Sequence, residues 1–299
     1  MKTLTIAMWD PGFSIQDLSL SEKIDVLEEK FKAVYQLAMS SLTDETTFLF
    51  LCPEFNLLNM KDLSNLSYTK SEFVDIEKRL QKLANDYPQA IIIPGTAYIQ
   101  KTLDLNDPEK DKKYAATIKK WQLEHLRTLK NFRQEIKDKT IIKSTASIFF
   151  ESKATKPKRY SKRVEAGEYI DAISSILYPG HSSPFFTHNG IRFGIEICAD
   201  HEDGVLLSEQ KEPIDVHVII ANVMRTMAGK VANKGCQENV IVVNCAGNFS
   251  YAPTAAKEVG VWVSGEGDLE RLKQDDSSSK DLRIYSDIPV PNQKISLTP

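Results

Sequence analysis

Short apolar runs that alternate with longer amphipathic stretches constrain the fold of this chain more than any other feature of its sequence. The runs are rich in β-branched and aromatic residues and are bounded by Gly, Pro, Asn or Asp, which is typical of buried strands. They span residues 4–8, 47–52, 90–94, 147–150, 191–198, 215–221, 240–245 and 259–264. Helical spacing of apolar side chains is found at residues 21–41, where Ser21 is the N-cap candidate, at 71–86 and at 225–239. This alternation predicts an α/β fold in which helices cover the faces of a sheet.

No linker or internal repeat divides the 299 residues, so we expect a single domain over residues 1–299. Residues 107–140 are dense in charge, yet their apolar side chains recur at roughly helical spacing, which predicts a charged helical insertion. The polar residues at about 275–282 predict a mobile loop. Residues 283–290 are expected to return as a last strand, and residues 291–299 to form a free tail.

Composition excludes several classes of protein. The chain has 38 basic and 41 acidic side chains, and its formal net charge of −3 gives no global footprint for nucleic acid or an anionic membrane. No apolar run is long enough for a membrane-spanning helix or a signal peptide. The four cysteines have the spacing of neither a disulfide framework nor a zinc site. We therefore expect a reduced, cytoplasmic protein that binds neither nucleic acid nor membranes.

Three segments carry residues that are suited to catalysis. In residues 193–201 a predicted strand runs into Cys198, where a thiol can be held as a nucleophile beside a backbone N–H, although a buried cysteine is more often a core residue. Glu54 follows another predicted strand and is either a solvated loop residue or a general base. Lys162 lies in a basic, hairpin-like stretch, residues 157–169, which on its own is typical of a solvated edge.

Taken together, these segments resemble the motifs of the nitrilase (carbon–nitrogen hydrolase) superfamily, whose catalytic residues occur in the chain order Glu, Lys, Cys. The matching stretches are residues 51–55, 160–162, 194–200 and 237–248. The resemblance covers roughly residues 1–290. It implies a four-layer αββα sandwich of the nitrilase type that pairs into a homodimer.

The resemblance also implies the roles of individual residues. Cys198 would be the nucleophile, Glu54 the general base, and Lys162 the cation that stabilises the thiolate and the oxyanion. The backbone N–H of Ala199 would be a second oxyanion donor. True nitrilases tend to carry Trp directly after the cysteine, so Ala199 favours amide over nitrile hydrolysis.

Members of this superfamily use a second glutamate between the lysine and the cysteine. Glu168 is the candidate here, and Glu165 is the alternative. His201, Asn222 and Arg225 are candidate substrate-binding residues, and His201 could instead cap the next helix. The five histidines are too scattered for a set of metal ligands, so we expect neither a metal nor a cofactor.

These residues predict an amidase that hydrolyses an amide or carbamoyl group of a small molecule through a Cys198 thioester. One rival reading is a true nitrilase. Another is a catalytically idle scaffold of the same fold, in which the helices of residues 107–140 bind a partner protein. The presence of Glu54, Lys162 and Cys198 favours an enzyme, because a protein of this fold that had lost its catalytic activity would have no physical reason to keep all three.

Overall fold

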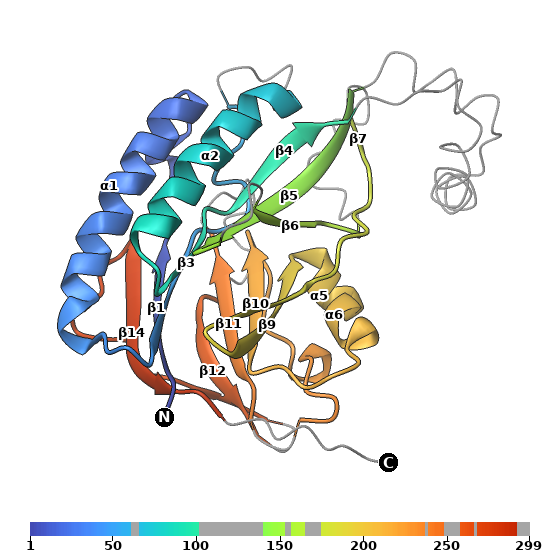
Figure 1. Cartoon of the computed structure of the whole chain (residues 1–299). Coiled ribbons are helices and arrows are strands. Elements are labelled where there is room, and N and C mark those ends of the chain that lie inside the picture. Colours follow the sequence, from blue (N-terminus) through green and yellow to red (C-terminus); the bar gives the residue numbers. More distant parts are fainter. Residues whose placement is uncertain are drawn as a thin grey trace.

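The computed structural model describes residues 1–60, 66–101, 140–152, 157–164, 175–236, 239–247, 258–265 and 268–291. Figure 1 shows the chain as two sheets with helices on their outer sides. In chain order the elements are β1 (Thr3–Trp9), η1 (Gly12–Ile15), α1 (Leu20–Ala38), η2 (Met39–Ser41), β2 (Thr46–Leu51), α2 (Lys70–Asp86), β3 (Ala90–Ile93), β4 (Thr96–Gln100), β5 (Thr140–Phe150), β6 (Lys158–Ser161), β7 (Ser175–Leu177), β8 (Phe185–His188), β9 (Ile191–Ile197), α5 (Ala199–Asp203), α6 (Val205–Glu209), β10 (Val216–Ala221), η3 (Ala228–Lys230), β11 (Ile241–Ala246), β12 (Gly260–Ser264), β13 (Leu269–Arg271) and β14 (Leu282–Pro289). Every apolar run that was predicted as a strand overlaps one, and β14 is the expected last strand.

The strands form two mixed sheets. The first has the order β14-β1-β2-β3-β5-β4, with β6 and β7 also paired to β5, and the second has the order β13-β12-β11-β10-β9-β8. Strands β1, β2 and β3 are parallel neighbours in the first sheet, as β9, β10 and β11 are in the second. Because parallel strands end at the same edge of a sheet, the loops after β9 and β10 lie side by side, and a hydrogen bond from the Glu54 N–H to the Ala221 carbonyl brings the loop after β2 of the first sheet to them.

The hydrophobic core has two main parts. The larger part lies between the sheets and joins residues such as Leu4 and Leu49 of the first sheet to Ile195 and Val218 of the second. The other part packs α1 and α2 against the outer face of the first sheet. On the outer face of the second sheet, Gly194 of β9 leaves room for α6, since a Cβ at this position would lie 2.7 Å from the Leu206 side chain. The layers therefore follow the order helix, sheet, sheet, helix, as the αββα prediction requires (Figure 1).

The long helices begin at capping boxes, in which the side chains of the first and fourth residues bond each other's backbone N–H groups. Helix α1 begins at Leu20 with Ser19 as its N-cap and Glu22 as the reciprocal partner, so the expected cap at Ser21 is wrong by two residues. Thr69 and Glu72 form the same arrangement at the start of α2. No described helix has the length and apolar character needed to cross a membrane.

Several predictions need correction or lie outside the described residues. Residues 225–236 contain a 3-10 turn, η3, in place of the predicted helix over 225–239. Strands β4, β6, β7, β8 and β13 were not predicted. Residues 107–139 of the expected insertion and residues 292–299 of the expected tail lie outside the described ranges, and residue 140 begins β5. At 275–281 the chain forms a turn that is hydrogen-bonded to β14, with Oδ2 of Asp275 accepting from the Ser286 hydroxyl (2.7 Å).

Candidate active site

Glu54 lies in the turn that follows β2, and its loop is fixed by contacts with both sheets. Its backbone N–H donates to the carbonyl of Ala221 at the end of β10 (3.1 Å). The next residue, Phe55, has a left-handed backbone (φ 67°), and its N–H donates to Oγ1 of Thr96 on β4 (3.0 Å). The Glu54 side chain is buried. The reading of Glu54 as a solvated loop residue is therefore wrong.

Lys162 directly follows β6 and is held by the neighbouring strand. Its N–H donates to the carbonyl of Ser144 on β5 (2.9 Å), and its carbonyl accepts the N–H of Gly180 (2.9 Å). Its Nζ lies 3.0 Å from Oε1 of Glu54, and both side chains are buried. Removing one partner of a buried ion pair typically costs about 3–5 kcal/mol, because the other charge is left buried without compensation. The fold thus brings together two residues that are 108 positions apart in the sequence.

Cys198 lies at the sharp turn between β9 and α5. Its backbone has φ 49° and ψ −111°, a combination that costs a non-glycine residue on the order of 1–3 kcal/mol. Its N–H donates to the carbonyl of Ile220 (2.9 Å), the residue next to the Ala221 carbonyl that binds the Glu54 backbone. Buried Ala199 is the first residue of α5. The turn therefore lies at the same end of β10 as Glu54.

Asp200 connects the Cys198 turn to the segment that carries Lys162. Its Oδ1 accepts the backbone N–H groups of Arg163 (2.9 Å) and Val164 (2.8 Å), and its Oδ2 accepts the hydroxyl of Tyr160 (2.7 Å). Burial raises the pKa of Asp200 above 3.8, against these hydrogen bonds, which favour the ionised form. The chain on both sides of Lys162 is thus fixed by the residue two positions after Cys198.

The remaining candidates from the sequence have different positions. Asn222 is buried directly after β10, where its Oδ1 would lie 3.7 Å from a Cβ placed at Gly247. Arg225 is exposed. Glu168 and its alternative Glu165 lie outside the described residues.

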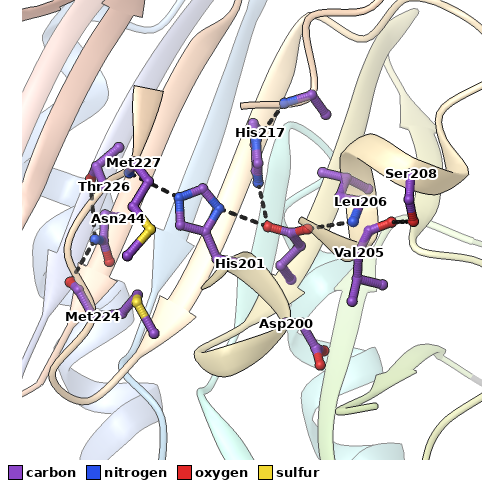
Figure 2. A network of polar contacts seen from close by, with 12 residues as sticks. Asp200, His201, Val205, Leu206, Ser208, His217, Met224, Thr226, Met227 and Asn244 are labelled. Carbon is purple, nitrogen blue, oxygen red and sulfur yellow. Dashed lines mark hydrogen bonds and ion pairs between the residues drawn. The ribbon is translucent and has the colours of Figure 1, made fainter. Parts of the chain in front are cut away.

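A buried carboxylate, Glu196 on β9, receives three hydrogen bonds on the outer face of the second sheet. Its Oε2 accepts from Nδ1 of His201 (2.9 Å) and from Nε2 of His217 on β10 (3.0 Å). Its Oε1 accepts the backbone N–H of Leu206 at the start of α6. All three ionisable side chains are inaccessible to solvent. We call Glu196, His201 and His217 the carboxylate–imidazole cluster, and Figure 2 shows it with its neighbours.

The second nitrogen of each imidazole fixes its tautomer. Nε2 of His201 accepts the N–H of Met227 (3.0 Å), and Nδ1 of His217 accepts the N–H of Ala232 (3.2 Å). An imidazole nitrogen that accepts a hydrogen bond carries no proton, so both rings are neutral and each gives its one N–H to Glu196. His201 has no ring nitrogen left for a substrate, and its interpretation as a substrate-binding residue is wrong.

The same contacts decide whether the cluster suits a metal ion. Glu196, His201 and His217 place one ligand atom each within 4.8 Å of one another. A neutral imidazole that binds a metal through one nitrogen carries its proton on the other. Here that proton would face the backbone N–H of Met227 or of Ala232, donor against donor. The donor set therefore fits a hydrogen-bonded carboxylate and does not fit a metal centre.

The protonation states follow from burial and from these contacts. Burial alone would raise the pKa of Glu196, but the interactions with His217 and His201 outweigh it and lower the pKa from 4.5 to about 2. Burial lowers the pKa of His201, and His217 and Lys230 lower it further, against the opposing effect of Glu196. At neutral pH, Glu196 is thus an anion and His201 is neutral, in agreement with the tautomer of His201.

The sequence analysis predicted neither the hydrogen bonds of the carboxylate–imidazole cluster nor those of Asp200. The available signal was a polar residue inside an otherwise apolar strand, at Glu196 and at His217, since a buried polar group needs a partner. The partners depend on strand order, because β9 and β10 are parallel neighbours in which His217 pairs with Gly194. The order of strands in a sheet cannot be read from the spacing of residues along the chain.

The comparisons with known proteins rest on structure. No family model matches the chain, and no curated protein sequence matches it. The structure is similar to that of Saccharomyces cerevisiae Nit3, a member of branch 10 of the nitrilase superfamily (TM-score 0.54, 14% identity, covering 96% of this chain and 91% of that one). It is also similar to an amidase from Nesterenkonia sp. AN1, in a mutant form with the acetamide moiety of fluoroacetamide added covalently at the active-site cysteine (TM-score 0.53, 14% identity, covering 96% and 91%). A carbon–nitrogen hydrolase from Helicobacter pylori is similar at a TM-score of 0.54 (12% identity, covering 96% and 88%). The chain therefore has the fold of the nitrilase superfamily.

Proposed function

We propose that this chain is a thiol-dependent hydrolase that cleaves a non-peptide carbon–nitrogen bond, in an amide or carbamoyl group of a small molecule, through a thioester on Cys198. The observation that carries the proposal is the buried ion pair between Lys162 and Glu54, whose loop binds β10 next to the residue that binds the Cys198 turn. A buried pair of charges is costly to maintain, and active sites are where proteins retain such arrangements.

The geometry supports a role for each residue in turn. Glu54 accepts the thiol proton of Cys198, since a cysteine thiol, with an ordinary pKa of about 8.5, is mostly protonated at neutral pH. The thiolate attacks the amide carbon and forms a C–S bond. The negative charge on the carbonyl oxygen is stabilised by the Lys162 ammonium and by the backbone N–H of Ala199. One such donor is worth roughly 3–4 kcal/mol of barrier.

The intermediate then collapses, and the C–N bond breaks. Glu54 gives its proton to the nitrogen, so that ammonia or an amine leaves and a thioester remains on Cys198. Glu54 next takes a proton from a water molecule, which attacks the thioester and releases the carboxylic acid. The thiol recovers its proton, and the enzyme returns to its starting state. The sum is one water consumed for each carbon–nitrogen bond cleaved.

The solved structures of similar fold favour amides as the substrate class. The Nesterenkonia amidase carries the acetamide moiety of fluoroacetamide at its active-site cysteine, and another of its structures contains butyramide. At 12–14% identity these structures guide the choice of compounds and do not assign a substrate. A panel of short aliphatic amides and carbamoyl compounds is therefore the first set to test, with the corresponding nitriles beside it.

Site-resolved alkylation tests the proposal without knowledge of the substrate. The folded chain is treated with less than one equivalent of iodoacetamide near neutral pH, and the labelled peptides are identified by mass spectrometry. We expect Cys198 to take nearly all of the label. Burial raises the pKa of Cys52, of Cys245 and of half-buried Cys236, so each of these thiols should stay protonated and react slowly.

Variants connect the thiol to its proposed partners. Lys162→Ala and Glu54→Gln should slow the labelling of Cys198, whereas Lys158→Ala, at the start of the preceding strand β6, should leave it unchanged. Ammonia release from an amide of the panel, lost in Cys198→Ala, would then identify the reaction. Label spread over Cys236 with Cys198 inert would overturn the proposal.

A further inference from the structure

A basic cavity of about 320 Å³ lies on the helix-covered outer face of the first sheet. Lys70 of α2, Lys101 after β4, Lys143 of β5 and Arg159 of β6 all line it. No aspartate or glutamate is found among its lining residues in the described part of the chain. In a protein with a formal net charge of −3, this is a local concentration of positive charge.

The charges in this cavity are not neutralised equally. Nε of Arg159 donates to Oε1 of Glu77 on α2 (2.6 Å), so this guanidinium already has a carboxylate partner. Lys143 is half-buried, and its Nζ lies 5.0 Å from the ring centroid of Tyr178. Burial lowers the pKa of Lys143, and the positive charges of Lys101 and Arg159 lower it further. Like charges held together at a half-buried position repel one another, and an anion in the cavity would relieve that repulsion.

Neutral donors complete the cavity. Thr145 and Ser161 contribute to its lining, and their hydroxyl groups lie 2.9 Å apart. Lysine ammonium groups and hydroxyls are typical partners of phosphate oxygens, with lysine acting as a point charge. The volume is at the lower end of the range for small-molecule sites.

We propose that this cavity binds a small molecule through its phosphate group. Lys70, Lys101 and Lys143 would neutralise the phosphate, and one hydroxyl of the hydrogen-bonded Thr145–Ser161 pair, the one whose proton is not used within the pair, would donate to a phosphate oxygen. The site differs from that of the proposed hydrolysis. Because successive side chains of a strand point to opposite faces, Ser161 lines the cavity while the next residue, Lys162, reaches Glu54.

Calorimetric titration of the full chain with inorganic pyrophosphate at low salt tests the proposal. We expect saturable binding at a single site that weakens as salt is added, because the contact is electrostatic. Lys143→Ala and Lys101→Ala should each weaken binding by about tenfold or more. Lys101 is exposed, so its variant tests the cavity even if Lys143→Ala is unstable.

Lys78→Ala and Lys82→Ala are the matched controls, since both lysines are exposed on α2 and pair with carboxylates of their own helix. Neither should change the affinity for pyrophosphate. No binding up to about 10 mM pyrophosphate, or an equal loss in Lys82→Ala, would overturn the proposal. Cys198→Ala should bind as the wild type does, so the result is independent of whether the chain hydrolyses amides.

Discussion

Replacing Glu196 by glutamine tests the carboxylate–imidazole cluster directly. In the wild type, this carboxylate accepts N–H groups from His201, His217 and Leu206. A glutamine keeps one oxygen and places an NH₂ group at the other position, against an N–H donor. The imidazoles cannot change tautomer to compensate, because Met227 and Ala232 donate to their second nitrogens. One buried donor therefore loses its acceptor, and the other hydrogen bonds lose their charge.

The size of the effect can be worked out from the structure in two ways. A pKa of about 2 in place of 4.5 means that the folded protein favours the anion of Glu196 over its neutral form by about 3 kcal/mol. Counting contacts gives a similar value. The unsatisfied buried donor costs about 1–3 kcal/mol, and each remaining hydrogen bond that no longer has a charged acceptor adds about 1 kcal/mol. We expect Glu196→Gln to lower the free energy of unfolding by about 3 kcal/mol.

Urea unfolding at pH 7, followed by circular dichroism, measures this difference. Glu202→Gln is the matched control, since Glu202 is exposed on the neighbouring helix α5 and its variant should unfold within about 0.5 kcal/mol of the wild type. A carboxyl group whose pKa is lower in the folded state than in the unfolded state stabilises the fold at pH values above its unfolded-state pKa. The difference between wild type and Glu196→Gln should therefore persist above about pH 4.5 and shrink as the pH falls towards 2. Equal unfolding midpoints for the two variants would refute the assignment of the tautomers.

Three further predictions follow from named contacts. Burial lowers the pKa of His201, so folding favours its neutral form. The wild type should therefore lose up to about 1.4 kcal/mol of folding stability per pH unit as the pH falls below about 6.5. In urea titrations between pH 7 and 5.5, the stability of a His201→Gln variant should depend less steeply on pH. A Cβ at Gly95 (φ 88°) would overlap the Pro53 carbonyl, so Gly95→Ala should cost at least about 2 kcal/mol and slow alkylation of Cys198, whereas Gly229→Ala, with open space around it, should do neither. Lys162→Met should lower the thermal unfolding midpoint, because it leaves the Glu54 carboxylate buried without a partner at a cost of about 3–5 kcal/mol, and an unchanged midpoint would contradict the burial of that pair.

The elements that could be predicted from the sequence are those whose formation depends on a local pattern of apolar residues. Apolar runs in the two sheets and the 3.6-residue period of α1 and α2 identify these elements, because burial acts on each independently. The short strands β6 and β13 were missed, since their residues are partly exposed and their apolar pattern is weak. Pairing with a longer neighbour, and not local propensity, makes them strands.

The predicted helix at 225–239 shows why the rest could not be predicted. Its apolar residues have helical spacing, but its backbone N–H groups donate to side chains from other parts of the chain. Met227 bonds His201, Ala232 bonds His217, and Lys234 bonds Oε1 of Gln210 (2.9 Å). These acceptors replace the hydrogen bonds of a helix, and only the folded chain places them there. The proposed catalytic residues, in contrast, were found through motifs that resemble a family.

One carbonyl group links the two halves of the sandwich. The Ala221 carbonyl accepts the N–H of Glu54, in the turn after β2 of the first sheet (3.1 Å), and the N–H of Gly247, directly after β11 of the second (3.0 Å). Bringing together residues so distant in sequence costs loop-closure entropy, which only the contacts of the docked sheets compensate. The site around Glu54 is therefore completed only when the sheets have docked. Reactivity of Cys198 would thus report the docking of the two sheets, and a chain with only one sheet formed would have the residues of the site without their arrangement.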